Sequence, residues 1–238
     1  MSIVENIAEL RQRVGTAARR SGRNSQDIEL MAVTKTVAPD RIREAYEHGI
    51  RLFGENRVQE FEAKTDALHD LVDARWHMIG HLQSNKAVKA TELFNAVESI
   101  DSLRLAQKLN TAASQQGKTV PVLIEINIGG EQAKSGVQPD SEDLEQLLRA
   151  APDLPHLSFQ GLMTVPPYGE DPEQSRLFFR RMRELATEIQ KRQLPNVEMK
   201  TLSMGMSHDF EVAIEEGTTR IRIGTAIFGE RKLQRSNA

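Results

Sequence analysis

The chain has 238 residues, of which 39% are hydrophobic and 27% charged, and this ordinary globular composition excludes a collagen-like or disordered protein. It contains no cysteine, which excludes disulfides, thiolate catalysis and cysteine-based metal sites. The formal net charge of −3 gives no electrostatic reason to expect nucleic acid or a membrane as a partner.

The first segment is predicted to be an amphipathic helix that ends near Ser21-Gly22. Its apolar residues recur at steps of four and three, and they are Ile3, Ile7, Leu10, Val14 and Ala17. Glu5 and Glu9 interrupt the continuous apolar stretch that a signal peptide needs. No run approaches the roughly 20 apolar residues of a membrane span. We therefore expect a cytoplasmic protein.

The same segment is rich in arginine, at positions 11, 13, 19, 20 and 23. The favoured interpretation is a solvated helix face. An anion-binding or nucleic-acid patch is less favoured, because no aromatic residues lie among the arginines. A third possibility is a surface that binds a protein partner.

Eight short apolar runs follow, and each is separated from the next by a stretch with helical spacing. The predicted strands are 28–33, 52–54, 76–79, 94–100, 120–128, 157–165, 199–203 and 220–223. The intervening helices are predicted from Pro39, from Val58, near Ser84, after Asp101 as N-cap, and around Leu144, Phe178 and Val212.

This alternation predicts parallel strands joined by crossover helices. Eight units in 238 residues match the size of a (β/α)8 TIM barrel, here with an extra N-terminal helix. An open doubly wound sheet is the alternative, but it usually has fewer units, and no G-x-G-x-x-G follows the first strand. No linker divides the chain, so we expect one domain over residues 1–238.

In such a barrel, active sites lie at the carboxyl ends of the strands. The first strand ends at Thr34-Lys35-Thr36, which places Lys35 at the barrel mouth. A partly desolvated lysine loses its proton more readily and can act as an amine nucleophile. The alternative is that Lys35 points into solvent.

The ends of strands seven and eight suggest a phosphate site. They are followed by 203–207 (SMGMS) and by 224–226 (GTA), and these two loops often bind phosphate in barrels of this kind. Glycine lets backbone N–H groups approach an anion, although both glycines could serve tight turns alone. Because strand eight neighbours strand one in a closed barrel, the phosphate would lie beside Lys35. A phosphorylated carbonyl compound held as a Schiff base fits this arrangement.

Other polar residues are weaker candidates. Arg220 and Arg222 share one face of strand eight, and Arg222 could reach the ligand or pair with a barrel carboxylate such as Glu125. Asn56 closes strand two at the mouth, and Lys134 is a second lysine there after strand five.

No metal site is expected. His77 and His81 are four residues apart, but a strand end and a glycine separate them, and no third ligand has matching spacing. Neither a G-x-S-x-G nucleophile elbow nor a P-loop is present.

Motifs along nearly the whole chain resemble the YggS/PROSC group of pyridoxal phosphate homeostasis proteins, whose fold is similar to the N-terminal barrel of alanine racemase. The matching motifs are AVTKT (32–36), FGENRVQE (53–60), WHMIGHLQSNK (76–86), SIDS (99–102), EINI (125–128), KSGV (134–137), GLMTV (161–165), LSMGMSHDFEVAI (202–214) and RIGTAIFGER (222–231).

The resemblance implies that Lys35 carries pyridoxal 5′-phosphate (PLP) as an internal aldimine. It implies that Ser203, Gly224 and Thr225 hold the phosphate, that Arg222 contacts the ring nitrogen or the phosphate, and that Asn56 lies near the ring.

Alanine racemases use a second base, a tyrosine from a C-terminal β domain of a partner subunit. This chain ends soon after its eighth strand, and of its two tyrosines only Tyr168 is expected near the mouth, Tyr46 being on a helix. We therefore expect a monomeric, non-enzymatic PLP carrier that influences vitamin B6 and amino-acid/keto-acid balance, with apo PLP-dependent enzymes as recipients. A weak racemase or a Schiff-base aldolase is the alternative.

Overall fold

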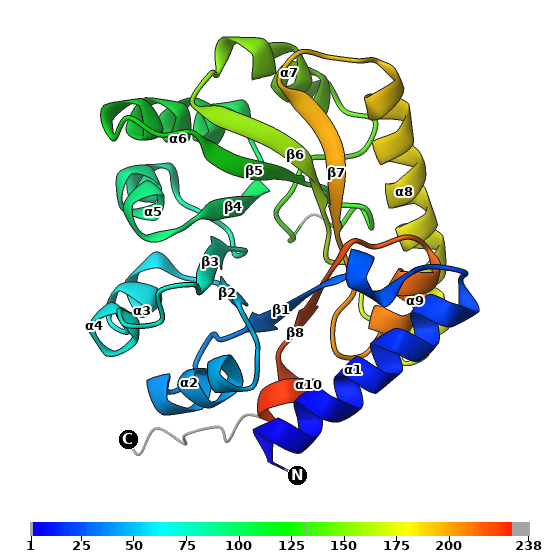
Figure 1. Ribbon diagram of the computed structural model, residues 1–238. Helices are drawn as coiled ribbons and strands as arrows, with labels where there is room; N and C mark the ends of the chain where they lie inside the picture. The colour runs from blue at the N-terminus through cyan, green and yellow to red at the C-terminus, as the bar shows by residue number, and fades with distance from the viewer. Residues whose placement is uncertain (1, 132, 230–238) are drawn as a thin grey trace.

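Eight parallel strands close into a barrel in the order β1 to β8, as the alternating sequence pattern predicts (Figure 1). The computed structural model describes residues 2–131 and 133–229, so the last two residues of the RIGTAIFGER motif and the predicted domain end at Ala238 lie outside the described residues. The strands are β1 (Glu29–Val33), β2 (Leu52–Glu55), β3 (Arg75–Met78), β4 (Ala96–Ile100), β5 (Val120–Glu125), β6 (Leu157–Met163), β7 (Val197–Ser203) and β8 (Arg220–Ile223).

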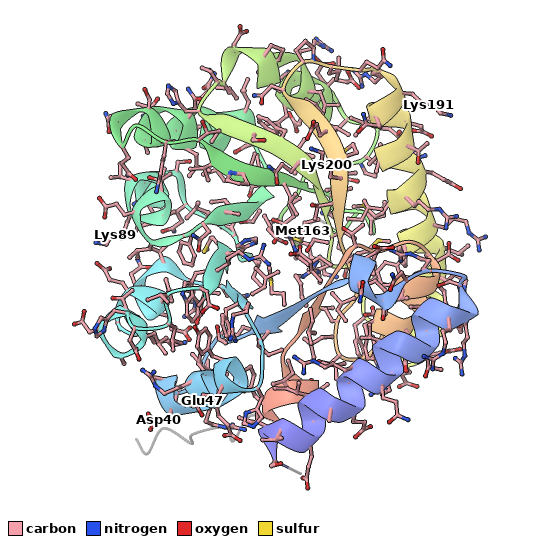
Figure 2. The ribbon with its side chains drawn as sticks, viewed as in Figure 1. Asp40, Glu47, Lys89, Met163, Lys191 and Lys200 are labelled. Atoms are coloured by element: carbon pink, nitrogen blue, oxygen red, sulfur yellow. The ribbon has the colours of Figure 1, made fainter. Side chains whose placement is uncertain are left out.

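Helices surround the barrel. They are α1 (Ile3–Arg20), α2 (Pro39–Glu47), α3 (Val58–Glu62), α4 (Thr65–Leu68), α5 (Ala87–Leu93), α6 (Leu103–Gln115), α7 (Glu142–Ala150), α8 (Arg176–Lys191), α9 (Phe210–Glu215) and α10 (Thr225–Phe228). Figure 2 shows Met163 near the middle of the ring of strands, while Lys89 on α5 and Lys191 on α8 lie outside the ring. Across the described residues, no helix combines the length and apolar character needed to cross a membrane.

Closure of the barrel brings the two ends of the strand order together. Met31 of β1 is in register with Leu52 of β2 on one side and with Arg222 of β8 on the other. The carboxyl ends of β1, β2 and β8 therefore meet at one edge of the barrel, and residues that follow these strands become neighbours.

Several local predictions are wrong, among them the starts of β4 and β7, which begin at Ala96 and Val197 rather than at 94 and 199. Ser102, not Asp101, caps α6, and its hydroxyl accepts the Leu105 N–H. The strand predicted to run to 128 ends at Glu125, because the backbone beyond it pairs with Val137 of its own loop. The sixth strand likewise ends at Met163 rather than at 165.

The apolar face of α8 is also shifted by one residue. Phe179 is fully buried and Phe178 is only half-buried. Both residues have acceptable helical spacing to Met182, so the sequence pattern alone does not set the phase of this face. Packing against the barrel selects Phe179.

Helix α1 packs along α9 and α10 across the outside of the barrel (Figure 1). Its apolar face is buried, and two of its arginines, together with Arg23 just after the helix, hold it in place. Arg11 donates to the His48 carbonyl at 3.1 Å, Arg13 pairs with Glu211 at 3.0 Å, and Arg23 donates to the Ile214 carbonyl at 2.9 Å. Of the arginines between positions 11 and 23, only Arg11, Arg19 and Arg20 are exposed, so the expected solvated arginine face is smaller than the sequence predicts.

Candidate functional site

Lys35 lies in a tight turn directly after β1. The Val37 N–H donates to the Thr34 carbonyl at 3.0 Å, so residues 34–37 form a β-turn with Lys35 in its second position. The side chain is partly buried, as expected for a lysine at the mouth of the barrel.

The loops after β7 and β8 are joined to each other, and the loop after β8 lies against β1. The Arg222 N–H donates to the Gly205 carbonyl at 2.9 Å, and the Ala226 N–H donates to the Ser207 hydroxyl at 3.2 Å. A Cβ at position 224 would lie 3.7 Å from the Cβ and the carbonyl oxygen of Val33. The loop after β8 therefore approaches β1 two residues before Lys35, as predicted from the pairing of β8 with β1, and the loop after β7 is joined to it.

Ser203 faces the interior. Its hydroxyl donates to Glu98 Oε2 at 2.6 Å and accepts from Arg222 Nη1 at 2.9 Å, so its single proton is directed into the barrel. Ser207 is partly exposed and Thr225 exposed, and both belong to the joined loops. Ser207 lies within the predicted phosphate loop 203–207, although the family resemblance implies only Ser203 of that loop as a phosphate ligand.

Arg222 is held rigidly at the end of β8. Its guanidinium donates to the Ser203 carbonyl at 2.6 Å and to the Thr164 carbonyl at 2.7 Å. Burial lowers the pKa of Arg222, yet an arginine pKa is high enough for the group to stay charged at neutral pH. The structure thus keeps a fixed cation beside the candidate phosphate loops.

The predicted pairing between a strand-eight arginine and a barrel carboxylate involves a different pair of residues. Arg220 pairs with Glu98 at 2.7 Å and with Glu29, whereas Glu125 accepts from the Ser135 hydroxyl at 3.0 Å. Arg220, Glu98 and Glu29 thus form a layer of ion pairs, and Arg222 lies two residues farther along β8, nearer the barrel mouth.

Glu98 is the centre of this layer. It is fully buried, and it also contacts His77 Nδ1 at 2.7 Å. Burial alone would raise its pKa, but His77, Arg220 and Ser203 together lower the pKa of Glu98 to about 2. His81 instead contacts Asp101 at 2.8 Å, so the two histidines serve separate carboxylates. In the described part of the chain, no three His, Asp or Glu side chains are grouped to hold a metal ion.

Three buried polar atoms near the strand ends have no hydrogen-bond partner within the described residues: Glu55 Oε2, Asn56 Oδ1 and Glu125 Oε2. Asn56 is held by a close approach of the loop after β3, since a Cβ on Gly80 would lie 2.3 Å from the Asn56 carbonyl oxygen. Burial raises the pKa of Glu125. Such unpaired atoms are costly, and a polar ligand at the mouth would satisfy them.

The remaining candidates lie farther along the rim. Lys134 pairs with Glu131 and donates to the Pro166 carbonyl at 3.2 Å. Tyr168 is 81% exposed, and its ring centre lies 5.4 Å from that of His208. Tyr168 therefore reaches the loop after β7 through His208, whereas these contacts do not tie Lys134 to the joined loops.

Comparison with known proteins identifies the family. Residues 4–232 match the family described as "Alanine racemase, N-terminal domain". The chain is 46% identical over 232 residues to a pyridoxal phosphate homeostasis protein of Aquifex aeolicus, covering 98% of this chain and 100% of that protein. It is 42% identical over 234 residues to the protein of the same name from Escherichia coli K12, covering 96% and 97% of the two chains.

Solved structures agree with this assignment. PipY of Synechococcus elongatus PCC7942, solved with PLP bound, is 38% identical and superposes with a TM-score of 0.83, covering 96% of this chain and 100% of PipY. An alanine racemase of Clostridium difficile 630 shares the fold at 14% identity, with a TM-score of 0.73, covering 98% of this chain and 58% of the racemase. The chain therefore belongs to the alanine racemase N-terminal domain family and, within it, to the pyridoxal phosphate homeostasis proteins.

Proposed function

We propose that this protein binds PLP as a Schiff base on Lys35. The observation that carries this proposal is the approach of Gly224, in the loop after β8, to Val33, the residue that ends the strand before the Lys35 turn. The aldehyde of PLP condenses reversibly with a primary amine, and a lysine at this position supplies that amine. The relatives named for pyridoxal phosphate homeostasis, and PipY with PLP bound, support the same cofactor.

The residues present fit this group. We assign the phosphate to the backbone of Gly224 and to the hydroxyls of Thr225 and Ser207, because these groups lie on the two joined loops. The resemblance implies Ser203 at the phosphate, but its proton is directed to Glu98, so we assign Ser203 the task of holding Arg222.

Arg222 and Asn56 would contact the ring. A guanidinium at the ring nitrogen donates a hydrogen bond and leaves that nitrogen unprotonated, which weakens the ring as an electron sink. The unpaired Asn56 Oδ1 is a polar atom that the ring substituents could satisfy. This environment suits storage of a reactive aldehyde better than amino-acid chemistry.

We therefore propose a non-enzymatic role. The protein would hold PLP safely and release it to apo PLP-dependent enzymes in the cytoplasm, with consequences for vitamin B6 and amino-acid/keto-acid balance. A monomer suits this role, and sedimentation should give a mass near 26.7 kDa. A weak racemase or a Schiff-base aldolase would use the same lysine.

The first experiment compares wild type with Lys35→Ala, using Lys134→Ala as the matched control at a second rim lysine. Each protein is mixed with PLP, its absorbance is recorded, and the product is reduced with borohydride and mapped by mass spectrometry. We expect a reducible band in wild type and Lys134→Ala, with the label on Lys35, and none in Lys35→Ala. No band in wild type would refute PLP binding through an imine.

A second experiment separates the carrier from an enzyme. The protein loaded with PLP is incubated with amino acids in deuterated water. Exchange of the α-proton no faster than with free PLP supports the carrier, whereas faster exchange that is lost in Lys35→Ala supports a racemase.

A further inference from the structure

The turn that carries Lys35 contains a strained residue. Thr36, at the third position of the turn, has φ +63°, in the left-handed region where glycine and asparagine are usual. A β-branched residue pays a conformational cost there, and such residues persist only where surrounding contacts hold them. Something outside the turn must therefore fix its shape.

A buried charged cluster lies directly behind this turn. The Lys64 ammonium donates to the Thr34 carbonyl at 2.9 Å, to Glu55 Oε1 at 3.0 Å and to Glu60 Oε1 at 2.8 Å. An ammonium has three protons, and each of them has an acceptor here. Glu55 ends β2 and Glu60 lies on the neighbouring helix α3 (Figure 1). We call Glu55, Glu60 and Lys64 the anchor cluster.

The anchor cluster binds the backbone on both sides of Lys35. On the N-terminal side, Lys64 holds the Thr34 carbonyl, and Glu55 accepts the Thr34 hydroxyl at 2.8 Å. On the C-terminal side, Glu60 accepts the N–H of the strained Thr36. The turn is therefore fixed at both ends by one hydrogen-bonded unit.

Stabilisation of the fold does not by itself explain the anchor cluster. The Glu55 side chain is fully buried, and only 11% of the Lys64 side chain is exposed. Buried ion pairs of this kind are often no more stabilising than apolar residues of similar volume, because desolvation offsets the attraction. A role in positioning explains why charged groups occupy this place.

We propose that the anchor cluster is a positioning device that fixes the Lys35 turn for attack on the aldehyde of PLP. In that step the neutral Lys35 nitrogen adds to the aldehyde carbon, a C=N bond replaces C=O, and one water leaves without any oxidant or reductant. Holding an amine in one geometry raises the rate of such a step. This inference rests on the proposed function.

The test compares Glu60→Ala, which removes the acceptor for the Thr36 N–H, with Glu60→Gln, which keeps an oxygen acceptor. Glu62→Ala is the matched control, because Glu62 lies on the same helix but pairs at 2.9 Å with Lys89, which lies on the outside of the molecule (Figure 2). The Glu60 side chain is 25% exposed, so its truncation should leave the barrel folded.

Two measurements are made on each protein. The rate of band formation with PLP should fall about tenfold or more in Glu60→Ala and stay near the wild-type rate in Glu60→Gln and Glu62→Ala. Without PLP, hydrogen exchange of the Thr36 amide, measured by NMR, should be protected in every protein except Glu60→Ala. Lys64→Met, which removes the bond to the Thr34 carbonyl, should also slow band formation.

The outcomes are distinct. Wild-type band formation together with an unchanged rate in Glu60→Ala would overturn this inference and leave the proposed function standing. An unprotected Thr36 amide in wild type would also overturn it. A wild type that forms no band would overturn the proposed function and this inference with it.

Discussion

The carboxylate of Glu98 has no contact with water, and three neighbouring side chains keep it ionised. His77, Arg220 and Ser203 all bind it, and its pKa falls to about 2 from the ordinary value of 4.5. Because the folded-state pKa is the lower one, this group stabilises the fold above about pH 4.5. That contribution is lost as the pH falls from about 4.5 to 2.

We predict that Glu98→Gln lowers the free energy of unfolding by about 3 kcal/mol at neutral pH, since it leaves the buried Arg220 without its central partner. The variant should also lose less stability than wild type between about pH 5 and pH 3, because the titrating group is gone. Urea unfolding at several pH values measures both effects. Equal acid sensitivity in the two proteins would contradict the role of Glu98.

The hydroxyl groups of Ser207 and Thr225 at the barrel mouth are proposed to bind the phosphate of PLP. Ser207→Ala and Thr225→Val should each weaken PLP binding about tenfold and leave binding of pyridoxal, which lacks the phosphate, unchanged. A hydrogen bond to a charged group contributes about 1.5–3 kcal/mol, which supports this magnitude.

Ser203→Ala is the informative comparison, because Ser203 contacts Glu98 and Arg222. Its loss should weaken PLP and pyridoxal alike. Affinities can be measured by absorbance titration of both compounds. A selective loss of PLP binding in Ser203→Ala, with Ser207→Ala unaffected, would return the phosphate to Ser203 as the family resemblance implies.

Among the elements, α1 has the least obvious purpose, because it lies outside the eight-unit pattern. Its apolar face contributes to the core, and Leu10 is only 2% exposed. Its Arg13 also stacks over Phe210 of α9 at 4.7 Å, beside the ion pair with Glu211. These contacts pack α1 firmly against the helices outside the barrel.

We predict that Leu10→Ala lowers the free energy of unfolding by about 2–5 kcal/mol, the usual cost of a cavity in a core. Arg20→Ala, at an exposed position on the same helix, should change it by less than about 0.5 kcal/mol. Urea unfolding of both variants decides the point. A negligible effect of Leu10→Ala would show that α1 is dispensable to the fold and favour its role as a binding surface.

Across the whole molecule, the repeating features were predictable and the contacts specific to this chain were not. The strand–helix alternation predicts the closed barrel, and closure predicts that Gly224 approaches the strand carrying Lys35. The anchor cluster was not predicted, because Lys64 lies between two short helices, where no pattern identifies its direction. Glu98 was a missed signal, since a carboxylate within the apolar strand AVESI must find partners inside the barrel.

Closure also means that one ligand can join distant parts of the chain. PLP bound through Lys35 after β1 and through the loops after β7 and β8 would link residues almost 200 positions apart. Any ligand that binds only the folded state stabilises it, by about 2.7 kcal/mol at a free concentration 100 times the Kd. For a protein of this size, that corresponds to a rise in Tm of roughly 5–10 °C.

We predict this rise for wild type and for Lys134→Ala, measured by differential scanning calorimetry with PLP in excess. Lys35→Ala should show only the smaller rise in Tm that comes from noncovalent binding at the phosphate loops. In wild type, pyridoxal should raise the Tm less than PLP does. The order of the three shifts separates the covalent from the phosphate contribution. An equal shift in wild type and Lys35→Ala would mean that the loops alone hold the cofactor, and that the amine at the end of β1 adds nothing to its retention.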